Sequence, residues 1–401
     1  MKRIIAILLA ALMVASLCAC GSKGTDGKDA SSFKIGIITL HDENSTYDKN
    51  FLDAVQRAKK NLNLTDEQVI IKTNVDESSA CYEAAVDMAD RGCSVVFADS
   101  FGHESYMAQA AEKYPDVQFC HATGTTAHTA NLKNLHNAFA SIYEGRFMAG
   151  VAAGMKLNEM IDAGTITAEQ AVIGYVGAYT YAEVISGYTS FFLGARSICP
   201  SATMKVQFTG SWYDETAEKE AATTLMNQGC VLISQHADSM GAPTACEAAG
   251  VPNISYNGST VDACPNTFIV STYIDWTPYF EYIIKCAMEG NAIDTDWVGT
   301  IDTGSVCMTD VNEKAAAPGT VEKLKEIKDG LMKGSINVFD TAAFTVGGEK
   351  LTSYLADVDT DPDYTPDTEV IIDGIFKESE KRSAPYFDLR IDGIECLNEE
   401  Y

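Results

Sequence analysis

Positively charged residues are scarce in this chain of 401 residues. Lysine and arginine together number 29, against 56 aspartates and glutamates, which leaves a formal net charge of −27 at pH 7. Nucleic acids and anionic membrane surfaces are bound through clusters of lysine and arginine, so this charge excludes both as the main partner. An acidic surface keeps a protein soluble, and no further function is needed to explain this charge.

Sequence patterns typical of hydrolases and metal sites are also missing. The chain contains no GxSxG, no HExxH and no phosphate-binding glycine-rich loop with lysine, so neither a surface hydrolase nor a nucleosidase is indicated. Its six histidines show no HxH or HxxxH spacing. A zinc-binding lipoprotein is an alternative, because His41, His121 and His236 lie at the ends of expected strands. We predict no enzymatic activity, no cofactor and no metal.

Cysteine is common, but no CxxC pair occurs among the twelve cysteines. Apolar periodic segments contain or adjoin five of them, and a free cysteine in such a place behaves as a small hydrophobic residue. These are Cys81, Cys93, Cys120, Cys230 and Cys286. We therefore expect buried thiols, with Cys246 and Cys264 as the first pair to test for a disulfide.

Long apolar runs are absent except near the start of the chain. Residues 4–18 follow Lys2 and Arg3 and are too few to span a bilayer, but they have the length of a secretory signal. Residues 17–20 match the bacterial lipobox, in which Cys20 becomes the lipidated first residue. We predict a signal peptide at 1–19, a flexible Gly- and Ser-rich linker at 20–32, and a monomer tethered to the outer face of the cell membrane.

Strands and helices alternate along most of the chain, and the alternation occurs twice. In segment 204–239, alternating apolar positions give way to a helix from Asp214 and then to the apolar run 230–233. Repeated strand–helix units indicate parallel α/β sheets flanked by helices, and the length favours two lobes. We place lobe 1 at 33–150 with a return around 276–300, lobe 2 at 151–275 with a return around 301–375, and a tail at 376–401.

The connections between these lobes are less regular. A helical pattern over 138–157 leads toward the second lobe, and a polar helix is expected near 159–169. Residues 386–391 are expected to add a late edge strand. Because the strand ends of the two lobes face each other across a cleft in this arrangement, we expect hinge closure around a small ligand.

Five stretches carry a resemblance to a known family. They are HATG (121–124), NAFASIYEGRFMAG (137–150), IGYVG (173–177), GSWYDETAEKEAATTLMNQG (210–229) and QHADS (235–239). Together they resemble the basic membrane protein family of substrate-binding lipoproteins, in its purine-binding branch. The resemblance spans about 33–341 and implies the two-lobed periplasmic-binding-protein type I fold, a small-molecule ligand and an ABC transporter permease as partner.

The resemblance also implies a purine base stacked between aromatic side chains, with its edge read by hydrogen bonds. The expected ligand contacts are Tyr47, Ser100, Phe101, Gly124, Tyr179, Trp212, Tyr213, Gln235, His236, Asp238, Asn257 and Trp276. Ser45 stands where this branch often has tryptophan, which leaves Phe101 or Tyr179 to complete the aromatic wall.

The nucleoside-binding branch holds the ribose with an acidic residue and a lysine, and this sequence has neither at the matching places. Asn257 occupies the first, while Ile274 and Asp275 lie near the second. A nucleobase such as adenine is therefore favoured over a nucleoside. A lipoprotein that senses the same ligand for a signalling receptor is the alternative, since its binding lobes would look alike.

Overall fold

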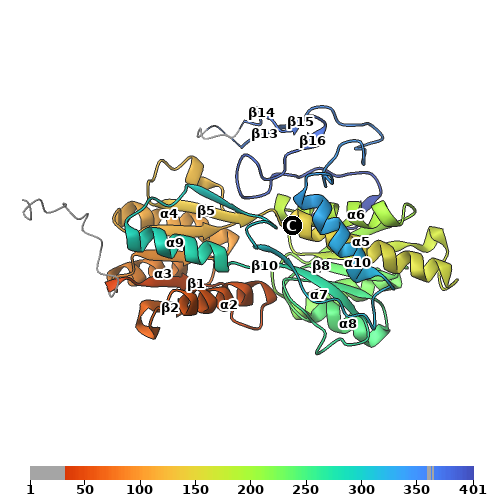
Figure 1. Cartoon of the computed structure of the whole chain (residues 1–401), viewed down its shortest axis with the longest axis horizontal. Coiled ribbons are helices and arrows are strands. Elements are labelled where there is room, and N and C mark those ends of the chain that lie inside the picture. Colours follow the sequence, from red (N-terminus) through yellow and green to blue (C-terminus); the bar gives the residue numbers. More distant parts are fainter. Residues whose placement is uncertain (1–31, 359–362, 364) are drawn as a thin grey trace, which may run out of the picture.

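The computed structural model of the chain describes residues 32–358, 363 and 365–401 (Figure 1). The expected signal peptide, the Cys20 lipidation site and almost all of the expected linker lie outside these residues. None of the helices in the described ranges combines the length and the apolar character needed to cross a membrane.

The first lobe is built on a parallel six-stranded sheet, on the left in Figure 1. Its strands, in the order β11-β5-β4-β3-β1-β2, are β11 (Asp296–Gly299), β5 (Leu135–Ala140), β4 (Gln118–Ala122), β3 (Val95–Ala98), β1 (Ile35–Ile38) and β2 (Val69–Lys72). Its helices are α2 (Thr46–Asn61), α3 (Ser79–Asp90), α4 (Glu104–Lys113) and α9 (Thr277–Glu289). The apolar strands β1 and β3 are buried along their whole length, as expected for a sheet covered on both faces.

The second lobe contains a seven-stranded sheet of the order β12-β10-β9-β8-β6-β7-β17. The strands are β12 (Val306–Met308), β10 (Phe268–Ile274), β9 (Asn253–Tyr256), β8 (Leu232–His236), β6 (Val172–Gly177), β7 (Thr203–Phe208) and β17 (Ile394–Cys396). The helices are α5 (Ile142–Asp162), α6 (Ala182–Ile198), α7 (Glu215–Asn227), α8 (Gly241–Ala249) and α10 (Thr320–Met332). Its strand pairs are parallel apart from β10 with β12. The expected α/β architecture of two sheets is confirmed.

Three short segments connect the lobes. They join β5 to α5, β10 to α9, and β11 to β12. Two backbone hydrogen bonds tie these segments together, from Ser141 N to the Gly299 carbonyl at 2.8 Å and from Asp275 N to the Ser305 carbonyl at 2.8 Å. Short, mutually bonded crossings of this kind allow the lobes to rotate as rigid bodies.

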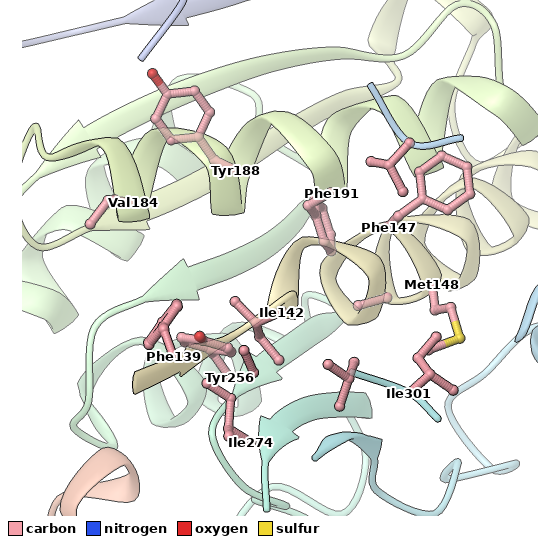
Figure 2. Close-up of a cluster of buried hydrophobic side chains, with 14 of the residues drawn as sticks. Phe139, Ile142, Phe147, Met148, Val184, Tyr188, Phe191, Tyr256, Ile274 and Ile301 are labelled. Atoms are coloured by element: carbon pink, nitrogen blue, oxygen red, sulfur yellow. The ribbon is translucent and has the colours of Figure 1, made fainter. Parts of the chain in front are cut away.

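Helices α5 and α6 form the tightest packing in the core (Figure 2). A Cβ atom on Gly150 would lie 1.9 Å from the carbonyl oxygen of Phe191, and one on Gly194 would lie 2.1 Å from that of Phe147. Both positions therefore require glycine. Arg146 of α5 is fully buried and donates to the Tyr175 hydroxyl at 3.0 Å, which fixes α5 against the second sheet.

The expectations for segment 138–169 were partly wrong. Residues 135–140 form strand β5, so α5 begins only at Ile142, and it then continues to Asp162. No separate polar helix follows, because residues 163–167 form a turn before the short 3₁₀ helix η5 (Ala168–Gln170).

The C-terminal residues are not a tail. After α10 the chain forms two small hairpins, β13 (Leu355–Ala356) with β14 (Thr368–Glu369) and β15 (Ile371–Ile372) with β16 (Ile375–Phe376), above the two lobes in Figure 1. The expected edge strand at 386–391 is absent, and β17 (394–396) instead completes the second sheet beside β7. Residues 386–391 are largely buried against the core, which explains their apolar pattern.

The ten cysteines in the described part of the chain are free. The five thiols expected in the core are buried, which confirms that expectation. Cys246 and Cys264 are also buried and form no disulfide.

Candidate functional site

A narrow pocket of about 380 Å³ lies between the two lobes, at the carboxyl ends of strands from both sheets. The first lobe lines it with Leu40, His41, Tyr47, Asp48, Ser100, Phe101 and Thr123, and the second with Glu183, Trp212, His236, Asp238 and Asn257. Open α/β sheets hold ligands at this edge.

The aromatic side chains of the first lobe are fixed by neighbouring elements. The Tyr47 hydroxyl donates to the Asp99 carbonyl at 2.9 Å, and its ring packs edge-on against Phe51. Phe101 begins the 3₁₀ helix η3 (Phe101–His103) directly after β3 and remains 39% exposed. One ring is therefore held inside the pocket and the other at its mouth.

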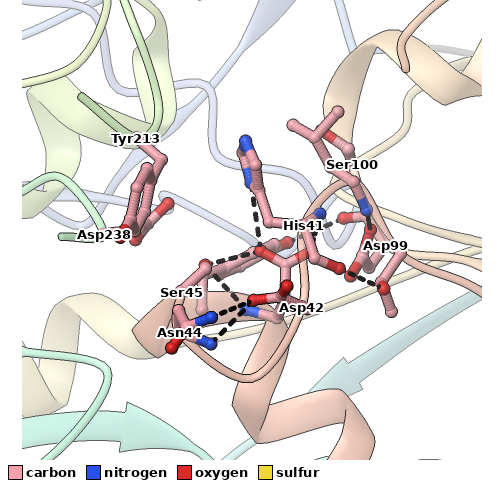
Figure 3. A network of polar contacts seen from close by, with 12 residues as sticks. His41, Asp42, Asn44, Ser45, Asp99, Ser100, Tyr213 and Asp238 are labelled. Atoms are coloured by element: carbon pink, nitrogen blue, oxygen red, sulfur yellow. Dashed lines mark hydrogen bonds and ion pairs between the residues drawn. The ribbon is translucent and has the colours of Figure 1, made fainter. Parts of the chain in front are cut away.

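A polar network supports the floor of the pocket beside β1 (Figure 3). Asp48 accepts hydrogen bonds from His41 N at 2.7 Å and from the Ser45 hydroxyl at 2.5 Å. Burial acts to raise the pKa of Asp48, but the bonds from His41 and Ser45 outweigh it and lower that pKa. Burial, with a further effect of Asp48, raises the pKa of Asp99 well above its ordinary value. These contacts favour the anionic form of Asp48, whereas burial favours the protonated form of Asp99.

In the second lobe, Asp238 and Asn257 form a hydrogen-bonded pair in the pocket lining. Asn257 Nδ2 donates to Asp238 Oδ1 at 3.0 Å. Asn257 has a φ of 64°, a left-handed conformation that asparagine tolerates better than most residues. Burial, followed by the nearby Asp48 and Glu218, raises the pKa of Asp238 well above its ordinary value.

His236 and Glu183 form the other polar part of the second lobe. His236 Nε2 lies 3.4 Å from Glu183 Oε1, and the His236 ring packs against Tyr256 with centroids 4.6 Å apart. Burial lowers the pKa of His236 more than Glu183 raises it, so the imidazole is neutral near pH 7. Its Nδ1 atom has no hydrogen-bond partner within the described ranges.

Among the described residues, the pocket lining contains three acidic side chains but neither lysine nor arginine. The acidic residues are Asp48, Glu183 and Asp238. Carboxylate oxygens accept hydrogen bonds from N–H and O–H groups. An anionic ligand would face buried negative charge without a partner, which is strongly unfavourable. The site suits a neutral or cationic molecule that is rich in donors.

Direct bonds between the lobes show that the cleft is closed. Asp238 O accepts from Thr46 N at 3.0 Å and from the Thr46 hydroxyl at 3.1 Å. Asn50 Nδ2 donates to the Asn257 carbonyl at 2.9 Å. These bonds join the start of α2 to the polar pair of the second lobe, so they close one side of the pocket.

Seven of the twelve residues expected to contact the ligand line this pocket. They are Tyr47, Ser100, Phe101, Trp212, His236, Asp238 and Asn257. Tyr179 lies behind Trp212, with the two rings edge to face at 5.0 Å. Tyr213 faces His41 outside the lining, with ring centroids 5.3 Å apart. Both are thus neighbours of lining residues.

The three other expected contacts are placed elsewhere for clear physical reasons. Trp276 is 1% exposed and stacks on Phe51 at 4.5 Å in the core of the first lobe. Gln235 is buried and its Oε1 accepts from Asn253 Nδ2 at 3.3 Å, within the second sheet. Gly124 is needed for packing, because a Cβ atom there would lie 2.1 Å from Asn137 Nδ2.

Five lining residues were not expected as ligand contacts. They are Leu40, His41, Asp48, Thr123 and Glu183. Leu40 and His41 directly follow β1, so their place at a strand end could have identified them. Asp48 and Glu183 lie in the first turns of α2 and α6, where acidic residues are common because they favour the helix dipole. Their sequence context therefore did not distinguish them from ordinary acidic residues at the start of a helix.

The described residues contain no group of three or more His, Cys, Asp or Glu side chains that could hold a metal ion. His121, proposed above as one ligand of a zinc site, is fully buried and its Nε2 lies 2.6 Å from the Ser100 carbonyl. His41, by contrast, lies at the pocket and beside Asp48. The three histidines are thus held by separate local contacts.

Residues 38–338 match the Bmp family, described as PnrA-like ABC transporter substrate-binding proteins. The chain is 32% identical over 251 residues to a putative ABC transporter glucose-binding protein of Haloferax volcanii, covering 62% of this chain and 60% of that protein. It is 31% identical over 268 residues to a purine-binding protein of Brucella abortus, covering 66% and 71%. A nucleoside-binding protein of Lactococcus lactis is 22% identical over 342 residues, covering 82% and 90%.

Solved structures support the fold. An ABC transporter solute-binding protein from Aeropyrum pernix has a TM-score of 0.62 at 17% identity, covering 79% of this chain and 94% of that one. One from Conexibacter woesei has a TM-score of 0.61 at 18% identity, covering 76% and 98%. The two-lobed fold expected from the sequence is that of these solute-binding proteins.

Proposed function

The chain belongs to the Bmp family of PnrA-like ABC transporter substrate-binding proteins, and from this premise we propose that its pocket captures a purine nucleobase such as adenine for an ABC importer. Proteins of this family work on the extracytoplasmic side of the membrane and bind solutes rather than transform them. Lipid anchoring through Cys20 is part of the proposal.

One observation carries the choice of ligand: aromatic rings from both lobes border a lining that has carboxyl groups, an amide and two imidazoles but neither lysine nor arginine. Tyr47 comes from the first lobe and Trp212 from the second. Stacking of a base on an aromatic side chain contributes about 1–3 kcal/mol. Oxygen atoms of Asp48, Glu183 and Asp238 can accept hydrogen bonds from the ring N–H and amino groups of an aminopurine.

The free base is favoured over the nucleoside by the two positions that hold ribose in the related branch. The side-chain Nδ2 of Asn257 donates to Asp238, and the main-chain carbonyl of Asn257 accepts from Asn50 Nδ2. Asp275 pairs with Arg57, with Nη2 and Oδ1 2.8 Å apart, and lies outside the pocket lining. Neither position supplies the charge that a ribose would find in the nucleoside-binding relatives.

Calorimetric titration of the protein tests this proposal directly. Adenine, guanine, hypoxanthine, adenosine, inosine and zinc chloride would be titrated in turn, and we expect adenine to bind most tightly. Tight adenosine binding without any response to free bases would reject the nucleobase preference. Conversion of a purine during the titration, detected by chromatography, would reject a pure binding role.

A monosaccharide is the second candidate, and glucose therefore joins the panel. One relative is named a putative glucose-binding protein, and carboxylate and amide groups beside an aromatic ring also suit sugar hydroxyls. The free base differs from glucose in being flat on both faces. We therefore expect adenine to quench the fluorescence of Trp212 and glucose to have no effect at the same concentration.

The proposed anchor and the proposed transport role need separate tests. Replacement Cys20→Ser should release the protein from the membrane fraction, whereas Cys18→Ser should leave it there. A ligand-sensing lipoprotein coupled to a receptor is the weaker alternative. Loss of purine uptake in a strain that lacks this protein supports transport, while intact uptake with a lost transcriptional response supports sensing.

A further inference from the structure

Two exposed aromatic rings from different lobes stack on each other at the mouth of the pocket. Phe101 of the first lobe and Tyr181 of the second are each 39% exposed, and their ring centroids lie 4.9 Å apart with 28° between the planes. Phe101 lines the pocket, but Tyr181 does not. Stacked exposed aromatics that bridge two lobes are in contact only while the cleft is closed.

Tyr181 is held in place within the second lobe. Its ring stacks on Tyr179 with centroids 5.1 Å apart and a 16° angle, and it lies 6.0 Å from the ring of Trp212. Tyr179 in turn meets Trp212 edge to face. The three rings form a row that leads from the pocket wall to its mouth, so Tyr181 has little freedom to leave Phe101 while the lobes are closed.

Phe101 is held in place by Glu77, which precedes α3. Glu77 Oε1 accepts hydrogen bonds from the Ser100 hydroxyl at 2.6 Å and from Gly102 N at 2.7 Å. These two donors are the residues on either side of Phe101. Glu77 does not line the pocket, so its effect on ligand binding acts through the two lining residues whose positions it fixes, Ser100 and Phe101.

We propose that Phe101 and Tyr181 form a latch that closes the mouth of the pocket, with Tyr181 and Glu77 acting as positioning residues that slow ligand release. The polar contacts of Thr46 and Asn50 close one side, and the aromatic pair closes another. Opening the cleft separates the two rings and exposes their faces to water. The inference depends on ligand capture in this pocket but not on the identity of the ligand.

The effect of the latch on ligand release is measured by the rate at which adenine dissociates from the protein. Tyr181→Ala should raise the dissociation rate about three- to tenfold, the effect of losing one aromatic pair, with a smaller change in the association rate. Tyr181→Phe keeps the ring and should retain the parent rate. Glu77→Ala should raise the rate in the same direction, whereas Glu83→Ala, an exposed glutamate of α3, is the matched control.

Lobe separation tests the latch even if adenine is not the ligand. Spin labels on noncanonical residues at Glu112 and Glu220, exposed on α4 and α7, would report the distance between lobes in the ligand-free protein. Tyr181→Ala should shift the distribution toward longer distances and Tyr181→Phe should not. An unchanged distribution in Tyr181→Ala would overturn the latch, whereas absent adenine binding in the parent protein would overturn only the purine proposal.

Discussion

Trp212 provides the largest flat surface of the pocket in the second lobe. It is half-buried, lines the pocket and is backed by Tyr179. The main-chain oxygen of Trp212 accepts from Asp238 N at 3.0 Å, so the loop that carries the ring is tied to the loop that carries the carboxylate. The stacking surface and the acceptor are therefore held at a fixed separation.

Replacement Trp212→Ala should weaken adenine binding by about tenfold or more, because base stacking contributes about 1–3 kcal/mol. Trp212→Phe keeps an aromatic face and should lose only part of the affinity. Calorimetric titration of both variants, with their melting temperatures as a check on folding, measures the effect. An unaltered affinity in Trp212→Ala would show that the ring serves packing alone.

Glu378 is a buried acid near the hinge, and its titration makes the stability of the fold depend on pH. It is 2% exposed and accepts a hydrogen bond from the Ser186 hydroxyl of α6. Burial raises the pKa of Glu378 to about 7, against the lowering effect of Ser186 and Ser379, and Glu144 and Glu183 raise it further. The folded protein therefore holds this proton more tightly than the unfolded chain does.

Because the folded state binds the Glu378 proton more tightly than the unfolded chain, the protein loses stability as the pH rises. Glu378 is protonated in both states below about pH 4.5, and stability falls as the pH rises toward 7, by roughly 3 kcal/mol for a shift of this size. Glu378→Gln should remove this part of the decline. Denaturant unfolding between pH 4.5 and 8 measures it, with Glu313→Gln as an exposed control. A parallel decline in Glu378→Gln would contradict the assignment.

The residues of the site were predictable where a strand end and a family motif coincide. Trp212, His236 and Asp238 satisfy both conditions and line the pocket. Trp276 does not, because its apolar neighbours draw the indole into the core of the first lobe. An aromatic side chain after a strand has the same sequence signature in both cases, and only the packing of the whole lobe distinguishes them.

At the level of elements, strand β5 was missed because it contains buried polar residues. These interrupt the apolar pattern by which a strand is predicted from sequence. Asn137 and His136 lie within β5 and are almost fully buried. Asn137 Oδ1 accepts from Ala127 N at 2.8 Å, and His136 Nε2 lies 2.8 Å from Gln118 Oε1. These partners come from elsewhere in the fold, so the polar residues look like a loop in sequence. The predicted helix therefore began at 138 and took in residues 138–140, which are the end of β5.

The contact between α5 and α6 allows a prediction about a single glycine. Gly150→Ala should lower the free energy of unfolding by at least about 2 kcal/mol, because its Cβ would meet the Phe191 carbonyl, which cannot move aside without shifting α6. Alanine is otherwise the better helix former, by about 1 kcal/mol. Denaturant unfolding measures the change.

Gly330→Ala in α10 is the matched control for this contact. Its added Cβ would meet side-chain atoms alone, Cδ1 and Cγ1 of Ile336 at 2.5 and 2.9 Å, and a side chain can change rotamer where a helix backbone cannot move aside. A much smaller loss is therefore expected. Equal stability of Gly150→Ala and the parent protein would mean that α5 and α6 do not approach as closely as their backbone geometry indicates.

On the scale of the whole molecule, the C-terminal region was the part that the sequence did not reveal. Its strand β17 has three residues, and its position depends on the free edge of β7 rather than on an apolar pattern of its own. The region also reaches the first lobe, where Ser383 N donates to Asp296 Oδ2 at 2.5 Å, and the hinge, where the hydroxyls of Ser141 and Ser379 lie 3.2 Å apart. Local sequence carries little information about such distant contacts.

Residues 394–401 connect this region to the binding loop of the second lobe. Asn398 donates to the Phe208 carbonyl at 3.0 Å and accepts from Phe208 N at 2.8 Å through its side chain. The main-chain oxygen of Tyr401 accepts from Thr180 N at 3.2 Å, and its ring lies against Gly210, two residues before Trp212. The edge strand and the last residue thus support both loops that carry the aromatic row of the pocket.

Removal of residues 394–401 should therefore lower the melting temperature and expose the edge of β7 to pairing with other chains. Size-exclusion chromatography with light scattering, run on both proteins, should give a larger mass for the shortened chain than for the parent protein. Tyr401→Ala keeps β17 in place and should have the same mass in solution as the parent protein, but it should loosen the loop at Gly210 and weaken ligand binding through Trp212. A shortened chain that stays monomeric, melts at the parent temperature and binds equally well would show that β17 is dispensable, and the second sheet would then be complete with β7 as its edge.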